Sequence, residues 1–376
     1  MRSNVIQTLR ELIQINSVNP AYESGAPEAG IASYIRRFFT DRGIKVCEQI
    51  VFPERPNVLA RVPGRDPSRR VVLEAHMDTA GITGMDRPAF EARIGNGRVY
   101  GRGACDTKAG LAAMMHAVAR VAAGPQPPCE VLFAATADEE HSYRGVVKLC
   151  EGLQADAAVV SEPTSMRLVR ATKGCVRFRV HVRGKAAHSS KPHLGVNAVS
   201  HMARLIVALE QDAQQLDHTV HPLLGPATFN IGIIRGGTQV NIVPDSCTIE
   251  IDRRLLPGEE PASVWDHYGR LVEACRDTLP GLDATLEPTI RDLPLETAGT
   301  ARVVQVAAQV LADLGLDAEP AGVPYGSDAS KLARAGIPSV VFGPGSIDQA
   351  HSATEFVSCD EVRQALEFYS RFLVAY

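Results

Sequence analysis

Acidic and imidazole side chains stand directly after three short, largely apolar segments of this chain. Residues 71–75 run into His76 and Asp78, residues 131–134 lead to the acidic triplet 138–140, and residues 157–160 lead to Glu162. Ligands of an open parallel sheet gather at the carboxyl ends of its strands. A single such group is commonly solvated or structural, but three strand ends together favour one shared site. Carboxylates and imidazole gathered in this way indicate metal binding or acid–base chemistry.

His76 and Asp78 are two positions apart on an expected strand, so their side chains face the same side. A metal-bound imidazole usually donates its other ring N–H to a carboxylate or a carbonyl, which fixes its tautomer. We therefore interpret His76 as a metal ligand and Asp78 as the group that orients its ring.

The segment 101–106 has two glycines that suggest a nucleotide-binding loop, but Asp106 replaces the third glycine of GxGxxG. A carboxylate at that position would repel a pyrophosphate and suits a metal ion. The sequence contains neither a G-x-x-x-x-G-K-[ST] loop nor a G-x-S-x-G elbow. The sequence therefore lacks the usual motifs of phosphoryl transfer and of serine hydrolases, and metal-assisted hydrolysis is the remaining interpretation.

The elements that must position these side chains alternate as short apolar strands and longer helices. This pattern is typical of an α/β fold with a mainly parallel sheet and helices on both faces. We expect an amphipathic helix within residues 1–20, an Ala-rich helix at 109–123 and a helix at 301–314. Strands are expected at 71–73, 131–134, 157–160 and 339–342.

From about residue 174 the pattern changes to the strict alternation of a half-exposed antiparallel strand at 176–182. Further strands at 228–234 and 247–253, with helices at 196–210 and 262–278, complete an α+β segment. The sequence therefore predicts a discontinuous catalytic domain at 1–173 and 288–376, with an inserted domain at 174–287.

Composition excludes several classes of protein. The chain has 376 residues, 45% of them hydrophobic, and a formal net charge of -4, so nucleic acid is not an expected partner. Its eight cysteines are scattered without a CxxC pair, which favours reduced thiols and a cytoplasmic location. No apolar run approaches the roughly 20 residues that span a bilayer. A membrane-free, cytoplasmic protein is expected.

Eight short motifs, in order along nearly the whole chain, resemble the metallohydrolase family of acetylornithine deacetylase, succinyl-diaminopimelate desuccinylase, aminoacylase and carboxypeptidase G. They are HMD at 76–78, GRGACDTKAG at 101–110, DEE at 138–140, SEPTS at 161–165, GKAAHSS at 184–190, GGTQVNIVP at 236–244, DRRLLPGE at 252–259 and QAHSATE at 349–355. Each motif alone is weak, whereas eight in order are specific. The segment EPTSMRLVRATKG favours the acetylornithine deacetylase-like members.

The resemblance implies two zinc ions per subunit, with Co or Mn as possible substitutes. It implies that Asp106 bridges the ions, that His76 and Glu162 hold one of them, and that Glu140 and His351 hold the other. Asp78 is then the orienting carboxylate. Glu139 resembles the general base that takes a proton from the water bridging the zinc ions and passes it to the leaving amine.

The inserted segment resembles the lid and dimerisation domain of this family, which implies a homodimer. His188 resembles the histidine that reaches into the partner subunit's site to stabilise the oxyanion, although by itself it would be taken for a turn histidine. Asn241 and Arg254 match substrate-holding positions, with Arg254 as a fork for a carboxylate. Strand alternation places the neighbouring Arg253 on the opposite face. Gly326 and Ser327 are expected to line the pocket.

The implied activity is hydrolysis of the amide bond of a small N-acyl amino acid. A small exopeptidase of the same family would use the same metals and base on a dipeptide or short peptide. A catalytically inactive binding or scaffold protein on this fold would lack the base or a ligand, and none of these positions is missing.

Overall fold

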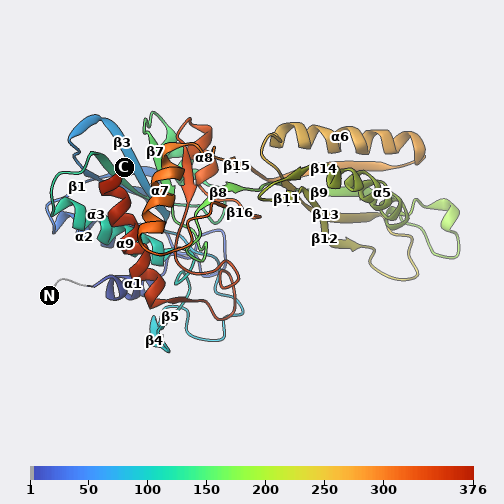
Figure 1. The fold of residues 1–376 in the computed structure, drawn as a ribbon. Helices are drawn as coiled ribbons and strands as arrows, with labels where there is room; N and C mark the ends of the chain where they lie inside the picture. Colours follow the sequence, from blue (N-terminus) through green and yellow to red (C-terminus); the bar gives the residue numbers. More distant parts are fainter. Residues whose placement is uncertain (1–3) are drawn as a thin grey trace. The chain divides into compact units, whose positions relative to one another are not determined.

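The computed structural model describes residues 4–376, and this part of the chain divides into two compact units (Figure 1). Unit 1 comprises the chain up to Arg170 together with residues 296–321 and 327–376, and unit 2 comprises residues 171–295 and 322–326. These divisions differ from the predicted 173/174 and 287/288. Strand β14 (Asp283–Asp292) pairs with β9 (Gly174–Arg183) as far as Asp292, which keeps residues beyond 287 in unit 2.

Within residues 4–376, the largest sheet has nine strands in the order β1-β2-β6-β3-β7-β17-β8-β15, and β16 also pairs with β8. Its four central strands, β6, β3, β7 and β17, run parallel, and antiparallel strands flank them. The strands are β1 (Lys45–Phe52), β2 (Arg55–Val62), β3 (Asp66–His76), β6 (Cys129–Thr136), β7 (Ala157–Val160), β8 (Val169–Thr172), β15 (Leu295–Glu296), β16 (Ala321–Val323) and β17 (Ser339–Val341).

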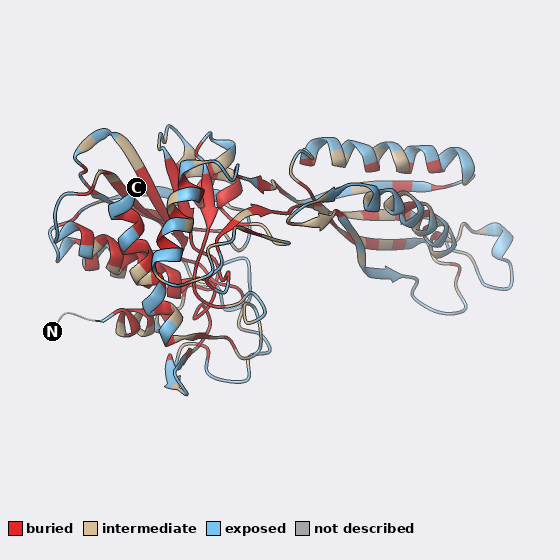
Figure 2. Ribbon diagram, in the orientation of Figure 1, coloured by how far each residue is buried: buried red, intermediate tan, exposed pale blue. Residues whose placement is uncertain are grey.

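Helices cover both faces of this sheet, so its central strands are buried on both sides (Figure 2). Val71, Val72 and Leu73 of β3 have no exposed surface, as expected for a continuous apolar run in a parallel sheet. On one face α2 (Ala29–Thr40), α3 (Lys108–Ala122) and α7 (Arg302–Asp313) contact the sheet, and α1 (Val5–Gln14) and α9 (Cys359–Ala375) pack against α3. On the other face α4 (Arg144–Cys150) and α8 (Ala329–Arg334) contact the sheet. The predicted α/β class is confirmed.

Two predicted helices illustrate how the sequence determines these elements. Helix α1 begins after Asn4, whose side chain accepts a hydrogen bond from the Gln7 backbone N–H, and it buries the apolar stripe that the sequence shows at helical spacing. Helix α3 is buried along most of its length, as its Ala-rich composition predicts, and it ends just before Gly124. A small sheet in the order β18-β5-β4 adds the strands β4 (Arg93–Gly95), β5 (Arg98–Tyr100) and β18 (Phe356–Ser358).

Unit 2 is built on an antiparallel sheet in the order β12-β13-β9-β14, with both of its α-helices packed on one face. Val176, Phe178, Val180 and Val182 of β9 are buried against these helices, and the residues between them are more exposed, as the predicted alternation requires. The remaining elements are η1 (Pro192–Leu194), α5 (Ala198–Ala213), η2 (Gln214–His218), β10 (Val220–His221), β11 (Gly225–Pro226), β12 (Thr228–Gly236), β13 (Ser246–Leu255) and α6 (Pro261–Thr278).

A search of residues 4–376 finds no helix whose length and apolar character would carry it across a lipid bilayer.

Candidate metal centre

The three strands that end in acidic or imidazole residues are direct neighbours, in the order β6-β3-β7. All three run parallel, and β3 pairs with β6 up to the register His76↔Thr136. The ladder continues past the strand ends, because Met77 N donates to Thr136 O at 2.8 Å and Ser161 N donates to Glu74 O at 2.8 Å. The segments 76–78, 138–140 and 161–162 therefore emerge at one edge of the sheet.

Asp106 lies in the loop before α3 and faces two histidines with its two carboxylate oxygens. Its Oδ1 is 3.1 Å from Nε2 of His76, and its Oδ2 is 3.4 Å from Nε2 of His351. The same Nε2 of His351 is 3.0 Å from Oε2 of Glu140. Asp106 thus joins residues that are 30 and more than 200 positions away along the chain.

These side chains form two groups that share Asp106. His76, Asp106 and Glu162 form one group, and Asp106, Glu140 and His351 form the other, with the potential ligand atoms of each group within 4.8 Å of one another. Each group could hold a metal ion. His351 has a left-handed backbone conformation, φ 56°, which is uncommon for a non-glycine residue and is one of the strained conformations that cluster at functional sites.

The residues present fit a metal ion. Among the described residues, Oε1 of Glu162 is buried and has no hydrogen-bond partner, although a buried unsatisfied polar group is costly. A cation in the first group would satisfy that oxygen. The donors are imidazole nitrogens and carboxylate oxygens without thiolate, a set that suits a catalytic zinc ion better than a structural one.

The protonation of the groups also matches a cation-binding site. Hydrogen bonds with Asp106 and Glu140 raise the pKa of His351 to about 10. Although burial alone would raise it, the contacts with His351 and His76 hold the pKa of Asp106 well below its ordinary value. In the metal-free protein the raised pKa values of His351 and His76 therefore favour protonated imidazoles beside Asp106, where cations would otherwise lie.

Metal binding is expected to expel at least one proton at pH 7. His351 must be neutral to ligate a metal, yet its pKa lies above neutrality, so the affinity for metal should rise as the pH is raised toward 10. Calorimetric titration with Zn²⁺ in two buffers of different ionisation enthalpy measures the proton release. The variant His193→Asn, which removes an exposed histidine outside both groups, should behave as wild type. Equal binding enthalpies in the two buffers would contradict this expectation.

Asp78 anchors the turn that carries Glu139 and Glu140. Its Oδ1 accepts a hydrogen bond from Glu139 N, and its Oδ2 accepts one from Glu140 N, both at 3.1 Å. The contact with His76 differs in detail from the expectation, because Nδ1 of His76 lies 2.9 Å from the backbone carbonyl of Asp78 and 3.6 Å from its carboxylate. Strand β3 ends at His76, so Asp78 is no longer on the strand and directs its carboxylate to the acidic turn.

A buried hydrogen-bond network, which the sequence analysis did not predict, holds the acidic turn in place. Nδ2 of Asn19 donates to Asp78 Oδ2 at 2.7 Å and to Asp138 Oδ1 at 3.0 Å. Arg55 reaches Asp138 at 2.8 Å and grips both carboxylate oxygens of Glu28 at 2.6 and 2.8 Å. These partners are distant along the chain and share no periodic pattern, so no local signal could have identified them.

Glu139 has the environment expected of a proton acceptor and donor. Burial raises the pKa of the Glu139 carboxyl well above its ordinary value, and the nearby negative charges of Asp328, Glu140 and Asp106 act in the same direction, while His76 opposes them. A general base that works near neutral pH requires such an upward shift.

A second buried carboxyl pair, Glu74 and Asp328, lies behind the centre and was not singled out from the sequence. Oγ1 of Thr136 is 2.5 Å from Glu74 Oε1 and 3.1 Å from Asp328 Oδ2. Burial, together with the charge of Asp328, raises the pKa of Glu74 well above its ordinary value. This raised pKa favours the protonated form of Glu74, which allows two carboxyl groups to share this buried position.

Unit 2 carries three of the predicted substrate residues. His188 is exposed, with Nδ1 2.8 Å from Ser190 Oγ, and Asn241 is exposed and accepts a backbone hydrogen bond from Ser189 at 3.0 Å. Strand β13 has the expected alternation: Arg253 is buried and pairs with Glu259, whereas Arg254 is partly exposed. The guanidinium of Arg254 is held by Asp252 at 2.7 and 3.2 Å, so a substrate carboxylate would compete with that partner.

Gly326 and Ser327 have structural explanations. A Cβ atom at Gly326 would lie 2.1 Å from Asp292 Oδ2, so a larger residue there would displace the Asp292 side chain. Ser327 is buried, and its Oγ accepts a hydrogen bond from Ala329 N at 3.3 Å at the start of α8. A role for either residue in lining the pocket stays a prediction.

Two carboxylate–imidazole groups that share Asp106, at the carboxyl edge of a mainly parallel sheet, are the arrangement expected of a metal-dependent hydrolase. The sequence pattern of peptidase family M20/M25/M40 matches residues 72–375 of the chain. The chain belongs to this family, whose members hydrolyse amide bonds, and the predicted family resemblance is confirmed.

Relatives span most of the chain. Acetylornithine deacetylase of Myxococcus xanthus is 32% identical over 346 residues, covering 89% of this chain and 85% of that protein. An M20 family metallo-carboxypeptidase of Sulfolobus solfataricus has the same fold, with a TM-score of 0.82 at 19% identity over 100% of this chain and 99% of that one. A dinuclear metal-binding M20 peptidase of Bacillus subtilis has a TM-score of 0.73 at 18% identity over 98% and 96% of the two chains.

Proposed function

We propose that this protein is a deacylase that hydrolyses the amide bond of a small N-acyl amino acid, with two zinc ions held by His76, Asp106, Glu162, Glu140 and His351. Co or Mn could replace zinc. The observation that carries the proposal is the position of Asp106, which joins two ligand groups next to the turn bearing Glu139. The 32% identity with an acetylornithine deacetylase favours an acyl amino acid as the substrate class.

The chain's own residues account for the proton transfers of amide hydrolysis. When bound, metal ions at the two groups supply Lewis acidity to the amide carbonyl and lower the pKa of water in the site. Glu139 takes the proton of the water that attacks the carbonyl carbon, and it gives that proton to the amine nitrogen as the carbon–nitrogen bond breaks. Asp78 holds the backbone of Glu139 and Glu140 in place during both transfers.

We further propose that unit 2 supplies the remaining substrate contacts and the interface of a homodimer. His188 of one subunit would donate to the developing oxyanion in the partner subunit, while Asn241 and Arg254 would hold the amino-acid portion. Strand β12 is an edge strand of its sheet and exposes Ile233 and Ile234, as a strand that pairs with a second copy would. A single monomeric species in analytical ultracentrifugation would contradict the dimer.

The substrate assignment is tested with the metal-loaded protein and a panel of N-acetyl, N-succinyl and N-formyl amino acids alongside dipeptides. We expect turnover of an acyl amino acid, lost in Glu139→Ala. Turnover of dipeptides alone would replace the deacylase with an exopeptidase of the same peptidase family. If the metal-loaded protein hydrolyses no compound of the panel, both the deacylase and the exopeptidase assignments are contradicted.

A further inference from the structure

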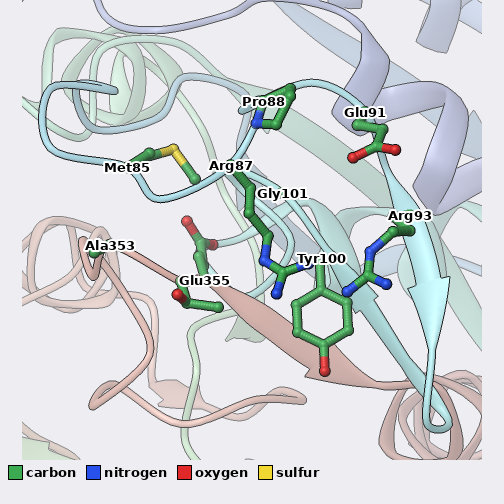
Figure 3. Close-up of a pocket in the computed structure, with 10 residues that line it drawn as sticks. Met85, Arg87, Pro88, Glu91, Arg93, Tyr100, Gly101, Ala353 and Glu355 are labelled. Atoms are coloured by element: carbon green, nitrogen blue, oxygen red, sulfur yellow. The ribbon is translucent and has the colours of Figure 1, made fainter.

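Glu355 is a buried carboxylate that belongs to neither metal-ligand group and has no part in the proposed proton transfers. It precedes strand β18, which pairs with β5 in the register Phe356↔Tyr100. Figure 3 shows Glu355 in the wall of a small cavity together with Gly101, Arg87 and Tyr100. Glu355 is the last residue of the QAHSATE motif, but no role was expected of it from that motif. Burial of a charge is costly unless the charge is paired and hydrogen-bonded.

Both oxygens of Glu355 are bound by the loop that carries Asp106. Oε2 accepts hydrogen bonds from Arg102 Nη1 at 2.7 Å and from Gly103 N at 3.0 Å. Oε1 accepts hydrogen bonds from Cys105 N at 2.8 Å and from Asp106 N at 3.0 Å. The carboxylate therefore determines the path of the backbone up to and including Asp106.

Arg102 connects these hydrogen bonds of Glu355 to a third loop. Its Nε donates to the carbonyl of Gly81 at 3.0 Å, just beyond β3, while its Nη1 binds Glu355. The backbone carbonyl of Glu355 also accepts a hydrogen bond from Gly101 N at 3.1 Å. Glu355 thus connects the loop after β3, the loop of Asp106 and the loop of His351, which lies only four residues before it.

We propose that Glu355 is a positioning residue for the metal ion that Asp106, Glu140 and His351 would hold, because it fixes the loop of Asp106 against the loop of His351. The inference rests on the proposed metal centre. In this proposal Glu355 touches neither substrate nor metal. It only fixes the positions of the two ligands Asp106 and His351.

The two ligand groups depend to different degrees on the hydrogen bonds that Glu355 makes. His76 ends a central strand and Glu162 follows another, so the sheet itself positions two of the three ligands in the first group. The second group takes both Asp106 and His351 from the loops that Glu355 joins. Losing Glu355 should therefore weaken the second group far more than the first.

The test is a calorimetric titration of the metal-free full chain with Zn²⁺, using wild type and Glu355→Gln. The amide is nearly isosteric, but its NH₂ group cannot accept the hydrogen bonds from the loop. We expect one of the two binding steps to lose about 10–100-fold in affinity, the usual effect of removing a group that orients metal ligands, and the other step to change much less. Glu361→Gln is the matched control, because Glu361 also accepts a backbone hydrogen bond nearby, from Gly345 N at 2.6 Å.

The ratio of the two binding constants separates positioning from a merely structural role. A structural role would lower the melting temperature of the metal-free protein and leave that ratio unchanged, and this result would overturn the proposal. Wild-type affinity at both steps in Glu355→Gln would also overturn it. If Glu355→Gln does not fold, Glu355→Asp is measured in its place, since the shorter side chain keeps the charge but cannot reach all four donors together.

Failure of this inference can be told apart from failure of the proposed function. If wild type binds two equivalents of zinc and hydrolyses no compound of the panel, the substrate assignment falls while the titration still reports on Glu355. If wild type hydrolyses an acyl amino acid and Glu355→Gln keeps the wild-type ratio, the function stands and the positioning role is wrong.

Discussion

Replacing Glu139 with glutamine is expected to lower kcat for amide hydrolysis by about 10²–10⁴-fold, the usual contribution of a positioned general acid–base group. Glutamine has nearly the same shape but cannot accept the proton of the attacking water or return it to the leaving amine. Because Glu139 belongs to neither ligand group, the variant should bind metal as wild type does. Steady-state kinetics and metal analysis of the same preparation measure both effects.

The control for this variant is Glu151→Gln, which removes an exposed carboxylate that pairs with Lys148 on the surface of the same unit. It should retain wild-type kcat and metal content. If Glu139→Gln keeps more than a tenth of the wild-type kcat with metal bound, another group is the base. If it loses the metal, Glu139 is a ligand and the division of roles in the acidic turn is wrong.

Asp106→Asn is expected to weaken both metal-binding steps together, and to abolish activity at metal concentrations that saturate wild type. Asp106 is the one residue that both ligand groups of the described chain share, with one oxygen directed to each histidine. An amide keeps a single carbonyl oxygen and no charge, so it cannot serve two cations. The loss should be at least as large as the about 10–100-fold effect known for residues that only orient ligands.

Zinc titration of Asp106→Asn beside Asp348→Asn makes this comparison. Asp348 is exposed near His351 and belongs to neither group, so its variant removes one carboxylate from the neighbourhood without removing a ligand. A variant of Asp106 that loses one equivalent and binds the other normally would show that the carboxylate does not bridge.

The elements with strong periodicity could be predicted from the sequence. The alternation in β9 and the apolar stripe of α1 correspond to the residues that the structure buries. Strand β14 was missed because Pro288 interrupts it, and proline usually argues against a strand. In the structure β14 is an edge strand with an irregularity between Pro288 and Ile290, where proline is tolerated.

The site could be predicted as far as its residues follow strand ends or motifs. Parallel strands bring their carboxyl ends to one edge, so the convergence of His76, Glu139 and Glu162 follows from the strand assignments. The residues that hold the acidic turn at 138–140 and the loop of Asp106 could not be predicted from strand ends or motifs. Asn19 meets Asp138 across 119 positions and Glu355 meets Asp106 across 249, and only the folded chain brings them together.

Crystals of the protein soaked in zinc, measured on both sides of the zinc absorption edge, test the central claim most directly. Two anomalous peaks are expected about 3.5–4 Å apart, the spacing of two-metal hydrolase sites. One peak should lie among His76, Asp106 and Glu162, and the other among Asp106, Glu140 and His351. A single peak, or peaks that avoid Asp106, would contradict the account.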